Sequence, residues 1–177
     1  MLDRCFAVPP LGKPALAFAW VLGAGFPAGV AVVLLVMARD GSISPLLVLA
    51  GQALLAMTVL LVLLPLWRRR VAFDGRRIRV ESTYYTREAP LADFDLGAAR
   101  VVDLREHTQL RPILKSNGYA LPGFQSGHFR LRDWKRRAFC LVTDPSKVLA
   151  LPHADGRVWL LSFDHPQAVL DILRRAI

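Results

Sequence analysis

Residues 14–38 read PALAFAWVLGAGFPAGVAVVLLVMA and residues 43–67 read ISPLLVLAGQALLAMTVLLVLLPLW, two stretches without a single charge. At about 1.5 Å per residue, a helix of either length reaches roughly 37 Å, which exceeds the ~30 Å hydrocarbon core of a bilayer. Apolar residues continue around every face and leave no polar stripe for water. We therefore expect two transmembrane helices, spanning residues 14–38 and 43–67.

The two stretches are joined by only four residues, Arg39-Asp40-Gly41-Ser42, which predicts a helical hairpin over residues 14–67. A cleaved signal peptide is disfavoured because its apolar region is only about 7–15 residues long. Pro27 is expected to kink the first helix. Gln52, well inside the second helix, is expected to form an interhelical hydrogen bond.

Small residues at helical spacing have two interpretations. Gly25 and Gly29 form a G-x-x-x-G motif, which is typical of specific dimerisation but also of plain packing between the two helices. Packing is favoured because Pro27 lies inside the motif and distorts its ridge. Small residues of the second helix are expected to allow close approach: Ala50, Ala53 and Ala56.

Charge and hydrophobicity are segregated along the chain. Its 177 residues are 54% hydrophobic, yet the formal net charge is +9, and residues 67–177 carry a net +8 of it. Arginines cluster directly after the second span, whereas the turn between the spans offers only Arg39, next to Asp40. The positive-inside rule therefore predicts that both termini are cytoplasmic and that the turn is outside. The strong preference for arginine over lysine is associated with GC-rich bacterial genomes, so we expect a bacterial inner membrane.

This pattern divides the chain into three parts: a cytoplasmic N-terminal tail over residues 1–13, the transmembrane hairpin over residues 14–67, and one cytoplasmic domain over residues 71–177. No Ser- or Gly-rich linker separates the domain from the second span. We therefore expect the domain to lie against the membrane surface.

The domain is predicted to be mostly β. Asp74-Gly75 indicates a hairpin turn, and residues 138–143 form a continuous apolar run typical of a central strand. Residues 107–127 contain several Pro and Gly turn signals and are expected to form a long loop. A helix capped by Ser162 or Asp164 is expected to close the chain. Seven short strands are expected in total. The first ends at residue 73, and the other six cover residues 76–88, 99–104, 128–133, 138–143, 147–151 and 157–163.

This order of elements resembles the bacterial pleckstrin-homology-like domains. The residues that carry the resemblance are GRRIRVESTYYTREAPLADF (75–94), NGYALPGFQSGHFRLRDWKRRAFCLVTD (117–144) and GRVWLLSFDHPQAVLDIL (156–173). The resemblance covers roughly residues 71–177 and implies a partly open, mostly antiparallel β-barrel of two orthogonal sheets with a C-terminal capping helix. The expected fold class is thus membrane-anchored α+β.

The sequence contains none of the motifs that would indicate an enzyme, a cofactor or a metal. The four histidines do not form H-x-x-x-H or H-E-x-x-H, there is no C-x-x-C, and neither a P-loop nor a nucleophile elbow occurs. The chain is therefore expected to be non-catalytic and to need no cofactor. A cryptic enzyme, with residues 107–127 as a lid, is a weaker hypothesis.

Two basic clusters are the candidate sites for contact with lipid headgroups, since a basic group near an anionic leaflet contributes about 1 kcal/mol. They are Arg68, Arg69, Arg70, Arg76 and Arg77 beside the second span, and Lys135, Arg136 and Arg137 in a predicted turn. Nucleic-acid binding is disfavoured because membrane topology already explains arginines next to a span.

Three functions remain open. The favoured one is a non-catalytic binding or scaffold module, in which the PH-like domain contacts another membrane protein or a second copy of itself at the cytoplasmic face. The second is a sensor of anionic lipid surfaces that uses the basic clusters. The third is an accessory subunit of a membrane enzyme or transport complex.

Overall fold

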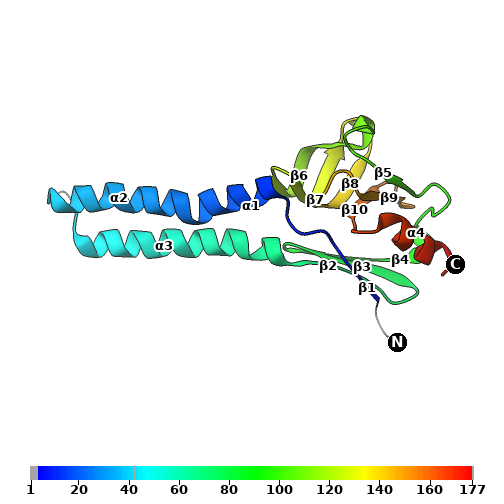
Figure 1. Cartoon of the computed structure of the whole chain (residues 1–177), viewed down its shortest axis with the longest axis horizontal. Coiled ribbons are helices and arrows are strands. Elements are labelled where there is room, and N and C mark those ends of the chain that lie inside the picture. The colour runs from blue at the N-terminus through cyan, green and yellow to red at the C-terminus, as the bar shows by residue number, and fades with distance from the viewer. Residues whose placement is uncertain (1–3, 42, 177) are drawn as a thin grey trace.

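The computed structural model describes residues 4–41 and 43–176, and it contains two long apolar helices side by side (Figure 1). The first runs over Lys13–Arg39 as α1 (Lys13–Trp20), a π-helical turn η1 (Val21–Gly25) and α2 (Phe26–Arg39). The second runs over Pro45–Trp67 as α3 (Pro45–Leu63) and a 3₁₀ turn η2 (Leu64–Trp67). Both helices are long and apolar enough to cross a membrane, with mean hydropathy 2.3 and 2.5. Ser42 of the predicted turn lies outside the described residues.

The sequence predicts a kink at Pro27, and the structure has a π-helical turn that ends two residues before this proline, at Gly25. Proline has no N–H to donate to the carbonyl of Gly23, four residues earlier, and η1 covers that position. Gly23 also makes the close contact between the helices, because a Cβ placed there would lie 3.0 Å from Leu63 Cδ1.

Several expectations about the hairpin interior are wrong. A Cβ placed at Gly25 or Gly29 would meet no atom within 4 Å, so these glycines do not pack against α3. Gln52 Nε2 is buried without a hydrogen-bond partner instead of forming the expected interhelical bond. The alanines expected at the contact are exposed, because the face that α3 buries contains larger residues: Val48, Leu55, Val59 and Leu63.

The rest of the chain forms two β-sheets and a helix. The four-stranded sheet has the order β1-β2-β3-β4, with β1 (Arg4–Phe6), β2 (Arg69–Phe73), β3 (Arg77–Ser82) and β4 (Tyr85–Pro90), all antiparallel. The six-stranded sheet has the order β5-β9-β10-β8-β7-β6, with β5 (Arg100–Val102), β6 (Pro112–Leu121), β7 (Phe124–Leu131), β8 (Arg137–Val142), β9 (Val148–Pro152) and β10 (Val158–Ser162). Helix α4 (Pro166–Arg174) ends the domain, and short 3₁₀ turns lie at Leu91–Asp93 and Thr108–Leu110. Within the described residues neither sheet closes on itself, and β8 and β10 are parallel.

Most of the predicted strands are confirmed, but the strand predicted over residues 76–88 is two antiparallel strands, β3 and β4, joined by a turn at Thr83-Tyr84. The predicted long loop is wrong. The hairpin around Asp74-Gly75 and the central strand over residues 138–143 are present as β2–β3 and β8. Residues 112–121 and 124–127, however, belong to the β6–β7 hairpin. Pro112 is tolerated because it is the first residue of an edge strand, and Pro122-Gly123 forms the turn, with Gly123 at φ +77.

Two glycines inside this hairpin allow the strands to approach unusually closely. Gly118 pairs with Gly127 beside a register shift in β6. A Cβ at Gly118 would lie 2.1 Å from the Ser126 carbonyl oxygen, and one at Gly127 would lie 2.5 Å from the Asn117 carbonyl oxygen. These glycines mark a close strand approach, not the turns that the sequence suggested.

The six-stranded sheet is buried on both faces, which explains the continuous apolar run of β8. One face packs against the four-stranded sheet and α4, through residues such as Phe139 and Leu161. The other face carries a second cluster, through residues such as Cys140 and Leu160, beneath the segment around Leu104 and Leu110. Figure 1 shows α4 packed beside both sheets at the end of the domain far from the helical hairpin.

The predicted cap of α4 is wrong. His165 occupies the N-cap position and forms no side-chain hydrogen bond there. Ser162 instead turns its hydroxyl to another loop, where Oγ accepts hydrogen bonds from the backbone N–H groups of Thr143 and Asp144 and donates to the Asp144 carbonyl.

Candidate functional site

The base of the helical hairpin packs directly into the β domain; we call this junction the neck, formed by Leu11, Ala15, Leu61, Leu66 and Tyr84. Leu11, Ala15 and Leu66 are 5%, 0% and 2% exposed and belong to the same core cluster as the sheet residues. The Tyr84 hydroxyl donates a hydrogen bond to the Leu61 carbonyl. That carbonyl lacks its usual helical donor because the residue four positions later is a proline.

The N-terminal tail is also part of the domain. Strand β1 pairs with β2 at the edge of the four-stranded sheet, and Phe6 packs edge-on against Phe163 with 5.8 Å between ring centroids. Further along, the Ala7 carbonyl accepts from the Asp164 N–H, and the Pro9 carbonyl accepts from Arg69 Nη1. The domain is therefore held at both chain ends of the helical hairpin.

The structure separates the first basic cluster. Arg68 hydrogen-bonds Thr86 at 3.0 Å and lies 3.7 Å from a Glu81 oxygen, while Arg70 is exposed. Arg69 is half-buried against the tail, and this burial lowers its pKa. These three residues follow the second helix directly and lie at the neck.

The other predicted residues lie elsewhere. Arg76 and Arg77 are at the opposite end of the β2–β3 hairpin, roughly 15 Å from Arg69 at about 3.3 Å per strand residue, and Arg77 pairs with Glu88 at 3.0 Å. Lys135 and Arg136 lie at the β7–β8 turn, where Arg136 pairs with Asp133 at 2.6 Å, and Arg137 is the first residue of β8. Headgroup contact by the eight basic residues stays a prediction, with only Arg68–Arg70 placed beside the apolar helices.

A basic groove that sequence reasoning missed lies between the two sheets, and its lining includes one predicted residue, Arg137 of the second basic cluster. It has a volume of about 330 Å³ and is lined by Arg87, Ser116, His128, Phe129, Arg130, Arg137 and Arg157. Arg130 and Arg137 are directly opposite each other on β7 and β8. Arg157 immediately precedes Val158, which pairs with Ala138. Three arginines thus form a row across three adjacent strands, which we call the arginine row.

Aromatic residues lie next to this row on the same face of the sheet. His128, Phe139 and Trp159 occupy β7, β8 and β10, each two residues from an arginine of the row. Their rings pack in sequence, with 5.3 Å between His128 and Phe139 and 5.1 Å between Phe139 and Trp159. A smaller cavity of about 120 Å³ reaches these rings.

The fourth arginine comes from the facing sheet. Arg87 on β4 places Nη2 3.2 Å from Nε2 of His128. Burial, together with the positive charges of Arg87 and Arg157, lowers the pKa of His128. A neutral imidazole can accept a hydrogen bond from the guanidinium, so this pair joins the two sheets.

Carboxylates are scarce in the groove. Arg157 pairs with Asp155, Nε to Oδ2 at 3.3 Å. Among the described residues, Arg87, Arg130 and Arg137 form no ion pair with a carboxylate. The groove therefore concentrates uncompensated positive charge between low-dielectric walls, an arrangement that attracts anions.

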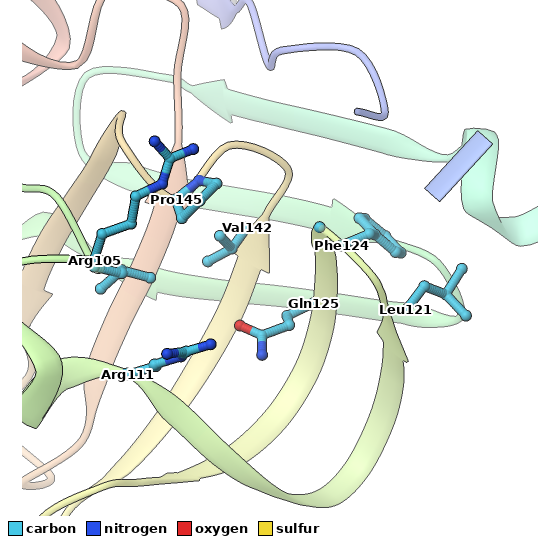
Figure 2. Close-up of a pocket in the computed structure, with 9 residues that line it drawn as sticks. Arg105, Arg111, Leu121, Phe124, Gln125, Val142 and Pro145 are labelled. Atoms are coloured by element: carbon cyan, nitrogen blue, oxygen red, sulfur yellow. The ribbon is translucent and has the colours of Figure 1, made fainter. Parts of the chain in front are cut away.

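A second cavity of about 310 Å³ opens beside β7 and β8 (Figure 2). Its lining includes Arg105, Arg111 and Gln125, with Phe124 and Leu121 at one end. Gln125 Nε2 donates to the Pro112 carbonyl at 3.3 Å, so its amide is already engaged in the structure of β6. The cavity brings together no nucleophile and base.

The described residues contain no group of three or more His, Cys, Asp or Glu that could hold a metal ion. One buried cluster of hydroxyls has catalytic residue types: Ser126 Oγ lies 2.6 Å from Ser82 Oγ and 2.8 Å from Thr83 Oγ1. These hydroxyls hydrogen-bond one another, and Thr83 also donates to the Ser82 carbonyl. The cluster links the two sheets. Cys140 is fully buried, and desolvation raises its pKa, so the thiol is suited to packing.

Comparisons with known proteins identify no relative. No family model, no curated protein and no solved structure matches the chain.

Proposed function

We propose that this protein is a non-catalytic module of the bacterial inner membrane, in which the helical hairpin spans the bilayer and holds a PH-like binding domain at the cytoplasmic face. The observation that carries this proposal is the neck, where Leu11, Ala15 and Leu66 join the hairpin and the domain in one hydrophobic core. A domain packed in this way keeps a fixed orientation toward the membrane, which suits a scaffold.

The tryptophans support a membrane position for the hairpin. Trp20 and Trp67 are 73% and 68% exposed. Gly23 contacts Leu63 across the hairpin. Trp20 lies three residues before Gly23 and Trp67 lies four residues after Leu63, both on the side toward the β domain. The two indoles are therefore within about one helical turn of each other along the helix axes. Indoles prefer the membrane interface. From Trp20 to Arg39 the helix rises about 28 Å, close to the ~30 Å hydrocarbon core.

The position of the two tryptophans along the helix axes defines the ends of the proposed membrane span more closely. The first membrane segment then covers residues 20–39 instead of 14–38, and the turns over residues 13–19 stand above the interface within the neck. The burial of Ala15 against the domain supports this division, because lipid cannot reach that side of the helix.

Both termini are proposed to be cytoplasmic, because Arg68–Arg70 follow the second helix while Asp40 neutralises Arg39 at the other end. We expect a C-terminal alkaline phosphatase fusion to be inactive and a C-terminal green fluorescent protein fusion to be bright. A fusion joined after Gly41 should show the reverse. An active phosphatase at the C-terminus would contradict the proposed orientation.

The proposed partner is another membrane protein or a second copy of this chain. A shallow apolar groove on the first helix is left uncovered by α3 and is lined by Val21, Gly25, Phe26, Gly29, Val30, Val33 and Leu34. Two residues of this lining, Gly25 and Gly29, are small, and small residues let helices approach closely in lipid. The G-x-x-x-G motif thus faces away from the hairpin, where it is available for association.

We expect in-cell crosslinking at native expression levels to yield a defined complex that the double variant Gly25→Ile/Gly29→Ile loses, because isoleucine fills the groove. Gly51→Ile is the matched control, since a Cβ there also meets nothing within 4 Å but lies on α3. Crosslinked mass spectrometry identifies whether the partner is this chain. A protein that remains uncrosslinked, or equal loss in both variants, would overturn association through this groove.

A further inference from the structure

We propose that the groove between the two sheets is a binding site for a water-soluble phosphate group, held by Arg130 and Arg137 of the arginine row together with Arg87. This assignment goes beyond the scaffold function and does not depend on the partner of the helices.

The strand register makes the arginine row costly without a ligand. Like charges directly opposite each other on neighbouring strands destabilise a sheet. Arg130 and Arg137 occupy such a pair, and Arg157 adds a third positive charge one strand further. An anion placed between them converts this repulsion into attraction.

The donors present match phosphate chemistry. Arginine offers a planar fork of N–H groups that binds phosphate oxygens in pairs, and such charge-assisted bonds are the strongest in proteins. Arg130 and Arg137 approach from one sheet and Arg87 from the other, so donors surround the groove on two sides. Ser116 on β6 also lines the groove.

The place of the groove favours a soluble ligand over a lipid of the protein's own membrane. Ser126, near the start of β7, has its Oγ 2.8 Å from Oγ1 of Thr83, the residue next to Tyr84 of the neck, and β7 continues from there toward Arg130. Strand β8 begins at Arg137, at that far end. The arginine row therefore lies away from the neck, about 13 Å along β7 from Ser126 at about 3.3 Å per strand residue.

The test uses the full chain in nanodiscs of phosphatidylcholine, a zwitterionic lipid, and isothermal titration with inorganic phosphate against sodium chloride of equal ionic strength. We expect saturable phosphate binding that weakens at least about tenfold in Arg137→Ala, since one charge-assisted bidentate contact is worth a factor of that order. Arg100→Ala is the matched control, because Arg100 is an exposed arginine on β5 outside the groove, and it should bind phosphate as the unaltered chain does.

Unfolding temperatures, measured with and without phosphate, distinguish a loss of phosphate binding from misfolding of the variant. Without phosphate, Arg137→Ala should unfold at the same temperature as the unaltered chain or higher, because the substitution relieves like-charge repulsion. With phosphate, only the unaltered chain and Arg100→Ala should gain stability. Absence of phosphate binding, or equal binding by Arg137→Ala, would overturn the site.

A vesicle measurement distinguishes the source of the phosphate. Added vesicles of phosphatidic acid and phosphatidylcholine present the same group on a surface. Binding to these vesicles without measurable binding of inorganic phosphate would overturn the assignment of a soluble ligand, whereas phosphate binding that exceeds vesicle binding supports it. Failure of the crosslinking experiment leaves these outcomes unchanged, so the two proposals fail separately.

Discussion

Gly127→Val is expected to prevent the six-stranded sheet from forming, at a cost above about 4 kcal/mol, which is a large fraction of a typical domain stability of about 5–15 kcal/mol. Gly127 has φ +108, and a Cβ there would lie 2.5 Å from the Asn117 carbonyl oxygen and 2.7 Å from Gly118 Cα. Both neighbours are backbone atoms of the paired strand, which cannot move aside without breaking the β6–β7 pairing. We expect little folded protein, rapid proteolysis and no cooperative thermal transition in detergent.

Gly123→Ala is the control that isolates the clash. Gly123 also has positive φ, +77, but a Cβ there meets nothing within 4 Å. The alanine therefore suffers only backbone strain, of order 1 kcal/mol. If Gly127→Val unfolds at the same temperature as Gly123→Ala, the close approach of β6 and β7 is absent from the native protein.

The β6–β7 hairpin shows why part of the fold could not be predicted from the sequence. Glycine and proline mark turns, close strand approaches and edge positions alike, and only the partner strand decides among them. Asn117-Gly118 and Gly127 were therefore interpreted as turn signals of a loop, although they lie within β6 and β7. The apolar helices were predictable because length and lack of charge are local properties that need no partner.

The arginine row could not be predicted from the sequence for a related reason. Arg130, Arg137 and Arg157 are scattered in the sequence, and only strand register brings them together. The alternation of Arg130 with buried Phe129 and Leu131 was visible, but it is typical of any half-exposed strand. The tail was equally hard to predict, since the three residues of β1 are too few to show a period.

Leu66→Ala is expected to loosen the neck and to destabilise the protein by about 2–4 kcal/mol, the usual cost of truncating a fully buried leucine. Leu66 is 2% exposed and belongs to the core cluster that also contains Leu11 and Ala15, so the substitution opens a cavity where hairpin and domain meet. Thermal unfolding in one detergent measures the loss. Leu64→Ala is the matched control, because Leu64 lies in the same 3₁₀ turn but is 55% exposed.

The neck hypothesis also predicts a change in geometry that stability alone would not show. Spin labels at Gly51→Cys and Arg76→Cys, in a chain whose exposed Cys5 is replaced by serine, report the distance between the second helix and the far end of the β2–β3 hairpin. A domain fixed by the neck gives a narrow distance distribution that broadens in Leu66→Ala and stays narrow in Leu64→Ala. A distribution that is already broad in the unaltered neck would mean that the domain reorients freely, and a freely reorienting domain cannot present one fixed face to a membrane partner.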